Sequence, residues 1–197
     1  MAEISLGPRP YAVPTPLWII GTYDREGNPD AMAAAWAGIA NSEPPCVVVG
    51  VRSSRKTYEN ILENRCFTIN VPNTTLAPQA DYFGIESGRE EKGKFEKAGL
   101  TPGRAGKINA PYVREFPLHL ECRLADRMTM GSHVVIIGQI LDVVADESVL
   151  DEKGRPDIKK IDPVIFAPVM QAYFGVGENI GKAFEIGKEF KDKKDPE

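Results

Sequence analysis

Apolar residues along the chain fall into short runs rich in β-branched side chains, separated by clusters of glycine, proline and charged residues. Such runs are typical of strands. Residues 17–23 and 31–37 flank the turn cluster DREGNPD and predict a β-hairpin. The same pattern predicts further strands at 44–51, 66–72, 115–130 and 133–146, of which the last two form the longest pair, divided by Gly131-Ser132.

One segment changes to helical spacing. Tyr58, Ile61, Leu62 and Arg65 recur at intervals of three and four, which predicts a helix over 53–65 with hydroxyl side chains at its N-cap. The remaining segments are an arm at 1–16, short helices near 76–84 and 89–99, a charged loop at 153–163, an apolar stretch at 165–177 and a frayed, charged tail at 188–197.

Six or so strands with few, short helices predict a mostly β protein, an antiparallel barrel rather than a doubly wound sheet. Regular strand–helix alternation is missing, and so is the G-x-G-x-x-G motif, which argues against a Rossmann domain. We expect a single domain over residues 1–197, with a core at about 8–190.

Composition and charge narrow the function classes. The chain is 42% hydrophobic and 26% charged, as in ordinary globular proteins, and its net charge is −4. A nucleic-acid-binding barrel is therefore disfavoured, because phosphate binding needs a basic face, with interleaved aromatics for single strands. The N-terminus does not resemble a signal peptide and no apolar run has membrane-spanning length, so we expect a cytoplasmic protein with no membrane partner.

The cysteines and histidines do not predict a metal site. Cys46, Cys66 and Cys122 are odd in number and far apart, which favours small, reduced core residues over disulfides. Only two histidines are present, without a cluster of cysteines or carboxylates beside them. The G-x-S-x-G motif of serine hydrolases is also absent.

The segment RSSRKT is the first candidate for chemistry. Arg52, Ser54, Arg55, Lys56 and Thr57 belong to it, and it lies between a strand and a predicted helix start, where anions bind. Charge-assisted hydrogen bonds contribute about 1.5–3 kcal/mol each, so Thr57 and one of Arg55 or Lys56 would dominate a phosphate site. The alternative is a capped helix start with solvated basic residues, and these residues alone leave the two evenly matched.

The second candidate is the stretch AMAAAWA, where Met32 and the small residues Ala33, Ala34 and Ala35 precede Trp36. Small side chains let a flat ring approach backbone N–H groups, and Trp36 could pack against that ring. Taken alone, the run is better explained as a tightly packed barrel interior with one core aromatic.

The histidines differ in their positions. His119 lies inside the strand pattern FPLHLEC and is better explained as a satisfied or exposed strand residue. His133 follows a Gly-Ser kink at the head of a strand, where barrels display site residues. It could donate a hydrogen bond to a ligand or transfer a proton near neutral pH.

Taken together, these stretches resemble the flavin reductase-like family, and within it the flavoredoxins. The resemblance covers roughly residues 8–190 and is carried by PTPLWIIGTYDREGNPDAMAAAWAGIANSEPPCVVVGV, RSSRKTYENILENRCFTINVP, QADYFGIESGREEKGKFEKAGLTP, APYVREFPLHLECRL, GSHVVIIGQILDV and AYFGVGENIGKAFEIGK. It implies an FMN-binding split β-barrel, Greek-key-like, that forms homodimers with the flavin near the subunit interface.

The resemblance also assigns residues. It implies flavin contacts at Asp30, Trp36, Thr57, Lys94, His133 and Phe166, with His133 as the candidate catalytic residue. Backbone from Met32 to Ala35 would reach the isoalloxazine edge, and Arg52 to Thr57 would surround the phosphate. Without the resemblance, Lys94 would be interpreted as one more solvated lysine.

Two positions depart from the family, which commonly has Asn where this chain has Asp30 and Thr or Ser where it has Ala33. An acid removes donors and alanine removes a hydroxyl, so both changes are expected to alter flavin binding or potential. The activity implied is electron transfer through FMN, with NAD(P)H or a redox protein as donor. The alternative is a non-catalytic FMN carrier or sensor.

Overall fold

The computed structural model describes residues 3–191 as a mostly β chain with short helices between strands. Its elements are β1 (Thr15–Pro16), β2 (Trp18–Tyr23), β3 (Pro29–Ala34), β4 (Ala37–Ser42), β5 (Pro45–Val51), α1 (Lys56–Asn64), β6 (Cys66–Val71), η1 (Thr74–Leu76), α2 (Ala77–Ile85), α3 (Lys94–Lys97), β7 (Pro102–Arg104), β8 (Pro111–Val113), β9 (Leu118–Met130), β10 (His133–Ala145), η2 (Glu147–Val149), α4 (Ile158–Ile161), β11 (Ile165–Ala167), β12 (Ala172–Phe174) and η3 (Lys188–Phe190).

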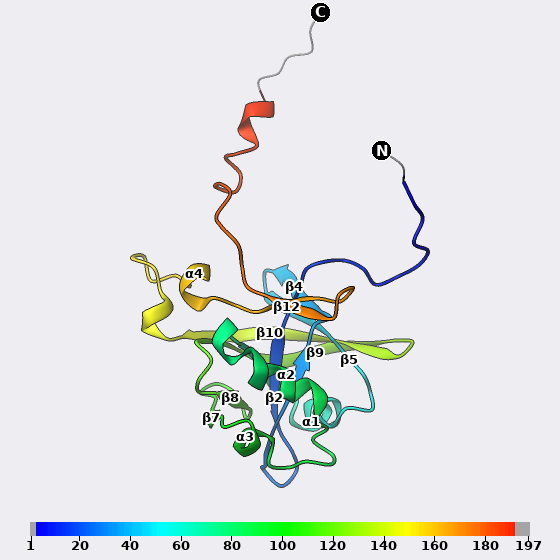
Figure 1. Cartoon of the computed structure of the whole chain (residues 1–197). Coiled ribbons are helices and arrows are strands. Elements are labelled where there is room, and N and C mark those ends of the chain that lie inside the picture. The colour runs from blue at the N-terminus through cyan, green and yellow to red at the C-terminus, as the bar shows by residue number, and fades with distance from the viewer. Residues whose placement is uncertain (1–2, 192–197) are drawn as a thin grey trace, which may run out of the picture.

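A seven-stranded antiparallel sheet forms the body of the molecule, in the order β3-β2-β6-β9-β10-β5-β4. β3 also contacts β5, although the two do not pair, so the sheet curls into a barrel whose end strands stay unjoined. The long hairpin of β9 and β10 crosses the width of the molecule (Figure 1). The predicted fold, a mostly β antiparallel split barrel with few short helices, is confirmed.

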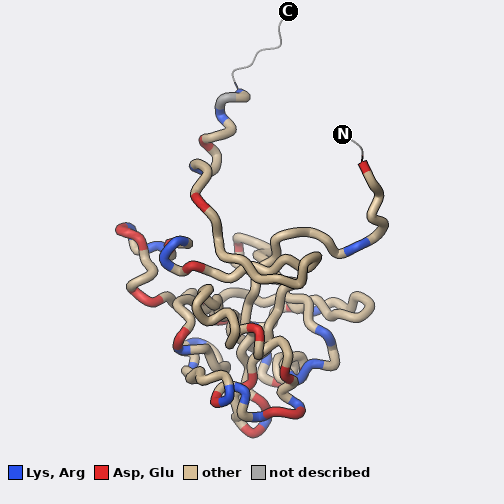
Figure 2. Tube along the Cα trace, in the orientation of Figure 1, with Lys and Arg blue, Asp and Glu red and all other residues tan. Residues whose placement is uncertain are grey.

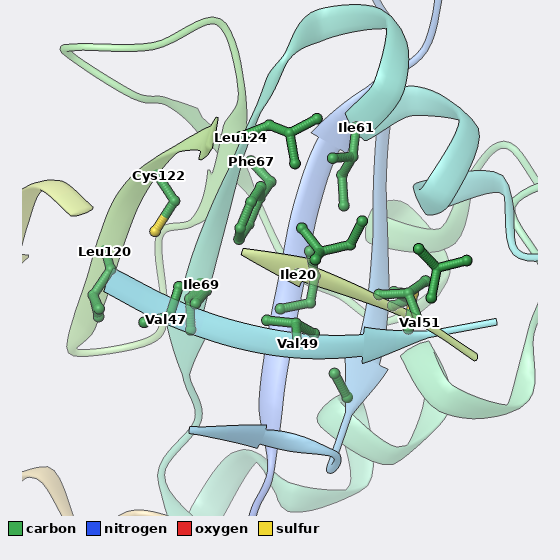
Figure 3. Packing of buried hydrophobic residues seen from close by; sticks show 14 residues of the cluster. Ile20, Val47, Val49, Val51, Ile61, Phe67, Ile69, Leu120, Cys122 and Leu124 are labelled. Carbon is green, nitrogen blue, oxygen red and sulfur yellow. The ribbon is translucent and has the colours of Figure 1, made fainter. Parts of the chain in front are cut away.

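Inward-facing strand residues fill the barrel, as strand alternation requires. Val47, Val49 and Val51 of β5 face Phe67 and its neighbours in one buried cluster (Figure 3). Each fully buried aliphatic or aromatic side chain contributes about 1.5–3 kcal/mol of burial free energy. A Cβ at Gly138 would lie 2.5 Å from Cζ of Phe67, so glycine makes room for the ring.

A second cluster covers the outer face of β2 and β3. Ile19 and Ala31 pack there against Phe83 of α2 and Phe95 of α3. The run at 17–23 lacks strict alternation of apolar and polar residues, which predicts that both faces of the strand are covered, one of them by a subunit partner. The partner is not needed for β2, because its second face is buried within the chain itself.

The predicted hairpin is present, but its second strand is shorter than expected. β3 ends at Ala34, the chain bends at Ala35 and Trp36, and β4 pairs with β5 instead of continuing the hairpin. The single strand predicted at 31–37 was therefore wrong. Small residues and a glycine left the strand Ala37–Ser42 without an apolar signal.

The helix predicted at 53–65 begins later than expected. α1 starts at Lys56, its N-cap residue is Arg55, and no side chain caps it. The expected hydroxyl cap was wrong. The charged loop predicted at 153–163 contains a short helix, α4. Of the tail predicted at 188–197, residues 192–197 lie outside the described residues.

All three cysteines are buried and unpaired. Burial raises the pKa of the Cys122 thiol to about 12, so it is protonated and unreactive at neutral pH. Within residues 3–191, no helix combines the length and apolarity that a membrane span requires. The same residues hold no group of three His, Cys, Asp or Glu side chains placed to bind a metal.

Candidate functional site

Three polar side chains from separate elements meet below the surface. The Thr57 hydroxyl, on α1, donates to Oδ2 of Asp30 on β3 at 2.8 Å, and Lys94 Nζ, on α3, lies 3.5 Å from the other carboxylate oxygen. Each of these residues is at most 6% exposed. At least 27 positions of sequence separate any two of these residues, so the fold alone brings them together.

Lys94 closes this buried cluster. Its ammonium donates to the carbonyl of Ala31 and to the carbonyl of Phe83 at 3.5 Å. Burial lowers the pKa of Lys94, and the neighbouring Asp30 opposes that shift. The ammonium therefore links β3, α2 and α3 through one buried cation.

The Thr57 hydroxyl has a different hydrogen-bond partner from the one that the sequence suggested. We expected it to donate to a phosphate, but in the structure it donates to Asp30. Thr57 as a whole is only 1% exposed. The residue's backbone N–H remains a candidate donor. Asp30 is also tightly enclosed, because a Cβ added at Gly88 would lie 2.3 Å from its Oδ1.

The loop before α1 presents a row of free donors. Among residues 3–191, no protein acceptor is found for the backbone N–H groups of Ser53, Ser54, Lys56 and Thr57. The last two belong to the first turn of a helix, where N–H groups have no partner within the helix. The row is therefore suited to an anion with several oxygens.

The cations of this loop are partly held by the protein. Arg55 donates to the carbonyl of Gly84 at 3.1 Å, and Lys56 pairs with Glu59 at 2.8 Å. Arg89, which was not predicted, donates to the Ser54 carbonyl at 3.0 Å and so holds the loop in place. They supply positive charge beside the donors, and solvent screens it only in part.

A groove of about 550 Å³ opens beside this loop, with Trp36, Gly50, Arg52 and His133 among its lining residues. Its volume is in the range of small-molecule sites. The groove lies on the outer face of β5 and β10, next to the tip of the β9–β10 hairpin. No charged residue lies between Arg127 and His133, and Figure 2 accordingly shows the tip of this hairpin in tan. Val48, Val135 and Met130 give it apolar walls.

Glycine at position 50 sets the shape of the groove. Its N–H donates to the Trp36 carbonyl at 2.6 Å, and an added Cβ would lie 3.1 Å from Cβ of Trp36 and 3.9 Å from the His133 ring. A side chain there would press against Trp36 and enter the space beside the His133 ring. Gly50 was not predicted, although a glycine inside an apolar strand is a known sign of close approach.

His133 is neutral at pH 7. Burial lowers the pKa of His133 and the charge of Arg52 lowers it further. One ring nitrogen, Nδ1, lies 2.9 Å from the Ser132 hydroxyl, and the imidazole lines the groove. A neutral ring leaves one N–H to donate.

The backbone at the end of β3 also has free donors. Met32 and Ala34 turn their side chains into the barrel core, and Ala33 packs against α2 beside Gly84. Past the strand, no protein acceptor within residues 3–191 receives the N–H of Ala35 or of Trp36. In this segment, therefore, the backbone rather than the side chains of residues 32–35 is available to a ligand.

Phe166 lies apart from these groups. It belongs to β11, where it pairs with Thr15 and packs on Tyr173 with ring centroids 5.5 Å apart. It is not among the residues that line the groove. The other predicted residues form two adjoining parts, the buried cluster with the loop before α1, and the groove.

The chain matches the flavin reductase like domain over residues 11–168, and it belongs to this family. Within the family it is similar to flavoredoxin of Desulfovibrio vulgaris (Miyazaki F), with 48% identity, a TM-score of 0.90 and coverage of 94% of this chain and 100% of that one.

The chain is also similar to a solved split barrel structure and to a named enzyme. A split barrel domain structure from Shewanella frigidimarina is 27% identical, with a TM-score of 0.78 and coverage of 86% of this chain and 85% of that one. The FMN reductase (NADH) RutF of Pseudomonas syringae is 22% identical over 62% of this chain and 66% of its own length.

Proposed function

We propose that this protein binds FMN across the loop before α1 and the adjoining groove, and that it passes electrons between NAD(P)H or a redox protein and an acceptor. The observation that carries the proposal is the row of unpaired N–H groups at residues 53, 54, 56 and 57, set beside an apolar groove. The similarity to RutF, an FMN reductase, supports the choice of cofactor.

The residues present suit FMN in charge and shape. A phosphate needs several donors and nearby cations, which Arg52, Arg55 and Lys56 provide beside the free N–H groups. A flat ring needs an apolar slot, which Trp36 and the walls of the groove provide. FMN, when bound, supplies the redox chemistry, and the protein supplies position and electrostatics.

Each part of the site has its own task. Trp36 covers one side of the groove and excludes water from it. The free N–H groups of Ala35 and Trp36 and the neutral imidazole of His133 are the donors available to the polar edge of a ring. Arg52 brings a positive charge to the same wall, which favours a ligand that gains negative charge on reduction.

Steady-state oxidation of NADH and NADPH by the FMN-loaded protein tests the reaction. An electron-transfer enzyme is expected to oxidise at least one of the two with an added acceptor present. A holo-protein that oxidises neither nucleotide, and whose FMN is also not reduced by a low-potential redox protein, would instead support the alternative, a non-catalytic FMN carrier or sensor.

We further infer that two chains associate through the face that holds the groove. Met128 and Met130 are 55% and 59% exposed there, and Trp36 is 39% exposed. Grouped, exposed apolar side chains mark interaction surfaces. Light scattering of the FMN-loaded protein is expected to give twice the chain mass of 21.6 kDa, and a mass of 21.6 kDa would contradict the dimer.

A further inference from the structure

A second hollow, of about 470 Å³, lies at the opposite end of the long hairpin. His119 pairs with Val144 at that end, while Met130 pairs with His133 at the other. The twelve residues from 119 to 130 span roughly 35 Å of extended strand, and Figure 1 shows the hairpin crossing the molecule. This hollow is therefore separate from the groove, and we call it the distal cleft.

The distal cleft is lined by a buried histidine that lacks a close partner. His119 is 6% exposed, and its ring stacks on Tyr112 with centroids 4.2 Å apart and planes 7° apart. Its Nε2 lies 3.8 Å from Oε1 of Glu121, beyond hydrogen-bond distance, and no other described residue is within reach of either nitrogen. His119 lines the cleft, so this nitrogen can meet a ligand there.

The charge state of this ring follows from its surroundings. Burial lowers the pKa of His119, while the carboxylates of Glu121 and Asp142 oppose the shift. The imidazole is neutral at pH 7. It can therefore donate one hydrogen bond and accept another.

Two cations line the distal cleft, Arg114 and Lys160, and neither forms an ion pair with a carboxylate of residues 3–191. The Arg114 guanidinium lies 6.0 Å from the Tyr112 ring centroid, and no carboxylate of residues 3–191 forms an ion pair with it. The lining Lys160 instead donates to the Leu150 carbonyl at 2.5 Å. The Arg114 fork is free to take a carboxylate in two parallel hydrogen bonds.

The acids that line the distal cleft are already engaged by backbone donors. Both oxygens of Glu115 accept from the N–H of Thr101, at 3.1 and 3.0 Å. Asp146 accepts from the N–H of Ser148 at 2.8 Å. These contacts hold the two carboxylates against the backbone but leave them charged, so Arg114 and Lys160 are the lining groups that would attract a ligand anion.

We propose that the distal cleft binds a small planar carboxylic acid. Its carboxylate pairs with Arg114, its ring lies along the Tyr112–His119 stack, and a polar ring substituent reaches the free nitrogen of His119. Phe116 and Val149 supply apolar surface to the same cleft. The volume suits a single-ring acid. This site does not depend on the proposed function of the groove.

Proton NMR of the two histidine rings tests the proposal. The sequence has only His119 and His133, so the ring signals can be assigned with the His133→Gln variant. The probes are benzoate, benzamide and acetate, which separate ring and charge. Benzoate is expected to shift the His119 signal in a saturable way, with benzamide and acetate at least about 10-fold weaker because each lacks one of the two contacts.

Arg114→Gln is expected to weaken benzoate about 10-fold or more, while the matched variant Arg123→Gln, which lies on β9 outside the cleft, keeps wild-type affinity. An unchanged His119 signal, a shift of His133 alone, or equal affinity for all three probes would overturn the proposal. Retention of benzoate affinity in a folded Arg114→Gln protein would overturn it as well.

Discussion

Replacing Lys94 by methionine is expected to lower the free energy of unfolding by about 3–5 kcal/mol, because it leaves a buried carboxylate without its cation. Lys94 is 1% exposed and Asp30 is 6% exposed. The change also removes the donor to the Ala31 and Phe83 carbonyls. Urea unfolding of the FMN-free protein at pH 7 measures the loss.

Two further variants separate the buried charge from general loss of packing. The double variant Asp30→Asn with Lys94→Met removes both charges and is expected to recover much of the loss. Lys97→Met breaks an exposed pair with Glu91, where Lys97 is 61% exposed, and is expected to cost at most about 1 kcal/mol. Equal losses for Lys94→Met and Lys97→Met would show that the buried pair contributes little.

Replacing Ser54 by glutamate is expected to weaken FMN binding about 30- to 150-fold, equivalent to about 2–3 kcal/mol. The new carboxylate would compete for the free N–H groups of residues 53, 54, 56 and 57 and repel the phosphate dianion. Ser54 is exposed, so the fold should tolerate the change. Quenching of flavin fluorescence measures the affinity.

Riboflavin, which lacks the phosphate, is the internal control for this variant. Its affinity for Ser54→Glu is expected to stay within about 2-fold of wild type. The matched variant Gln139→Glu adds the same charge beside Arg123, away from the loop, and should bind FMN normally. If Ser54→Glu lowered the affinity for both flavins equally, the loop would not be the phosphate site.

The fold was largely predictable because strand alternation and turn residues are local signals. The long hairpin broke at Gly131 and Ser132 as expected, and its strands run Leu118–Met130 and His133–Ala145. β4 was missed because small residues carry no periodic apolar signal. The cover over the outer face of β2 was also missed, since it comes from α2 and α3, far along the chain.

The site was predictable only in part, for the same reason. The composition of RSSRKT and its position before a helix predict an anion site. The partner of Thr57 is a non-local carboxylate, and no spacing in the sequence indicates that Asp30 takes its hydroxyl. Lys94 lies in a charged stretch that resembles solvent-exposed sequence, yet it is buried. Only the family resemblance singled it out.

The phosphate site is the central claim, and the comparison of FMN with riboflavin tests it most directly. Titration of the flavin-free wild-type protein is expected to give one FMN per chain, bound about 100-fold more tightly than riboflavin, because two or more charge-assisted hydrogen bonds depend on the phosphate. Equal affinity for FMN and riboflavin would contradict the account, since the free donors before α1 would then bind no phosphate.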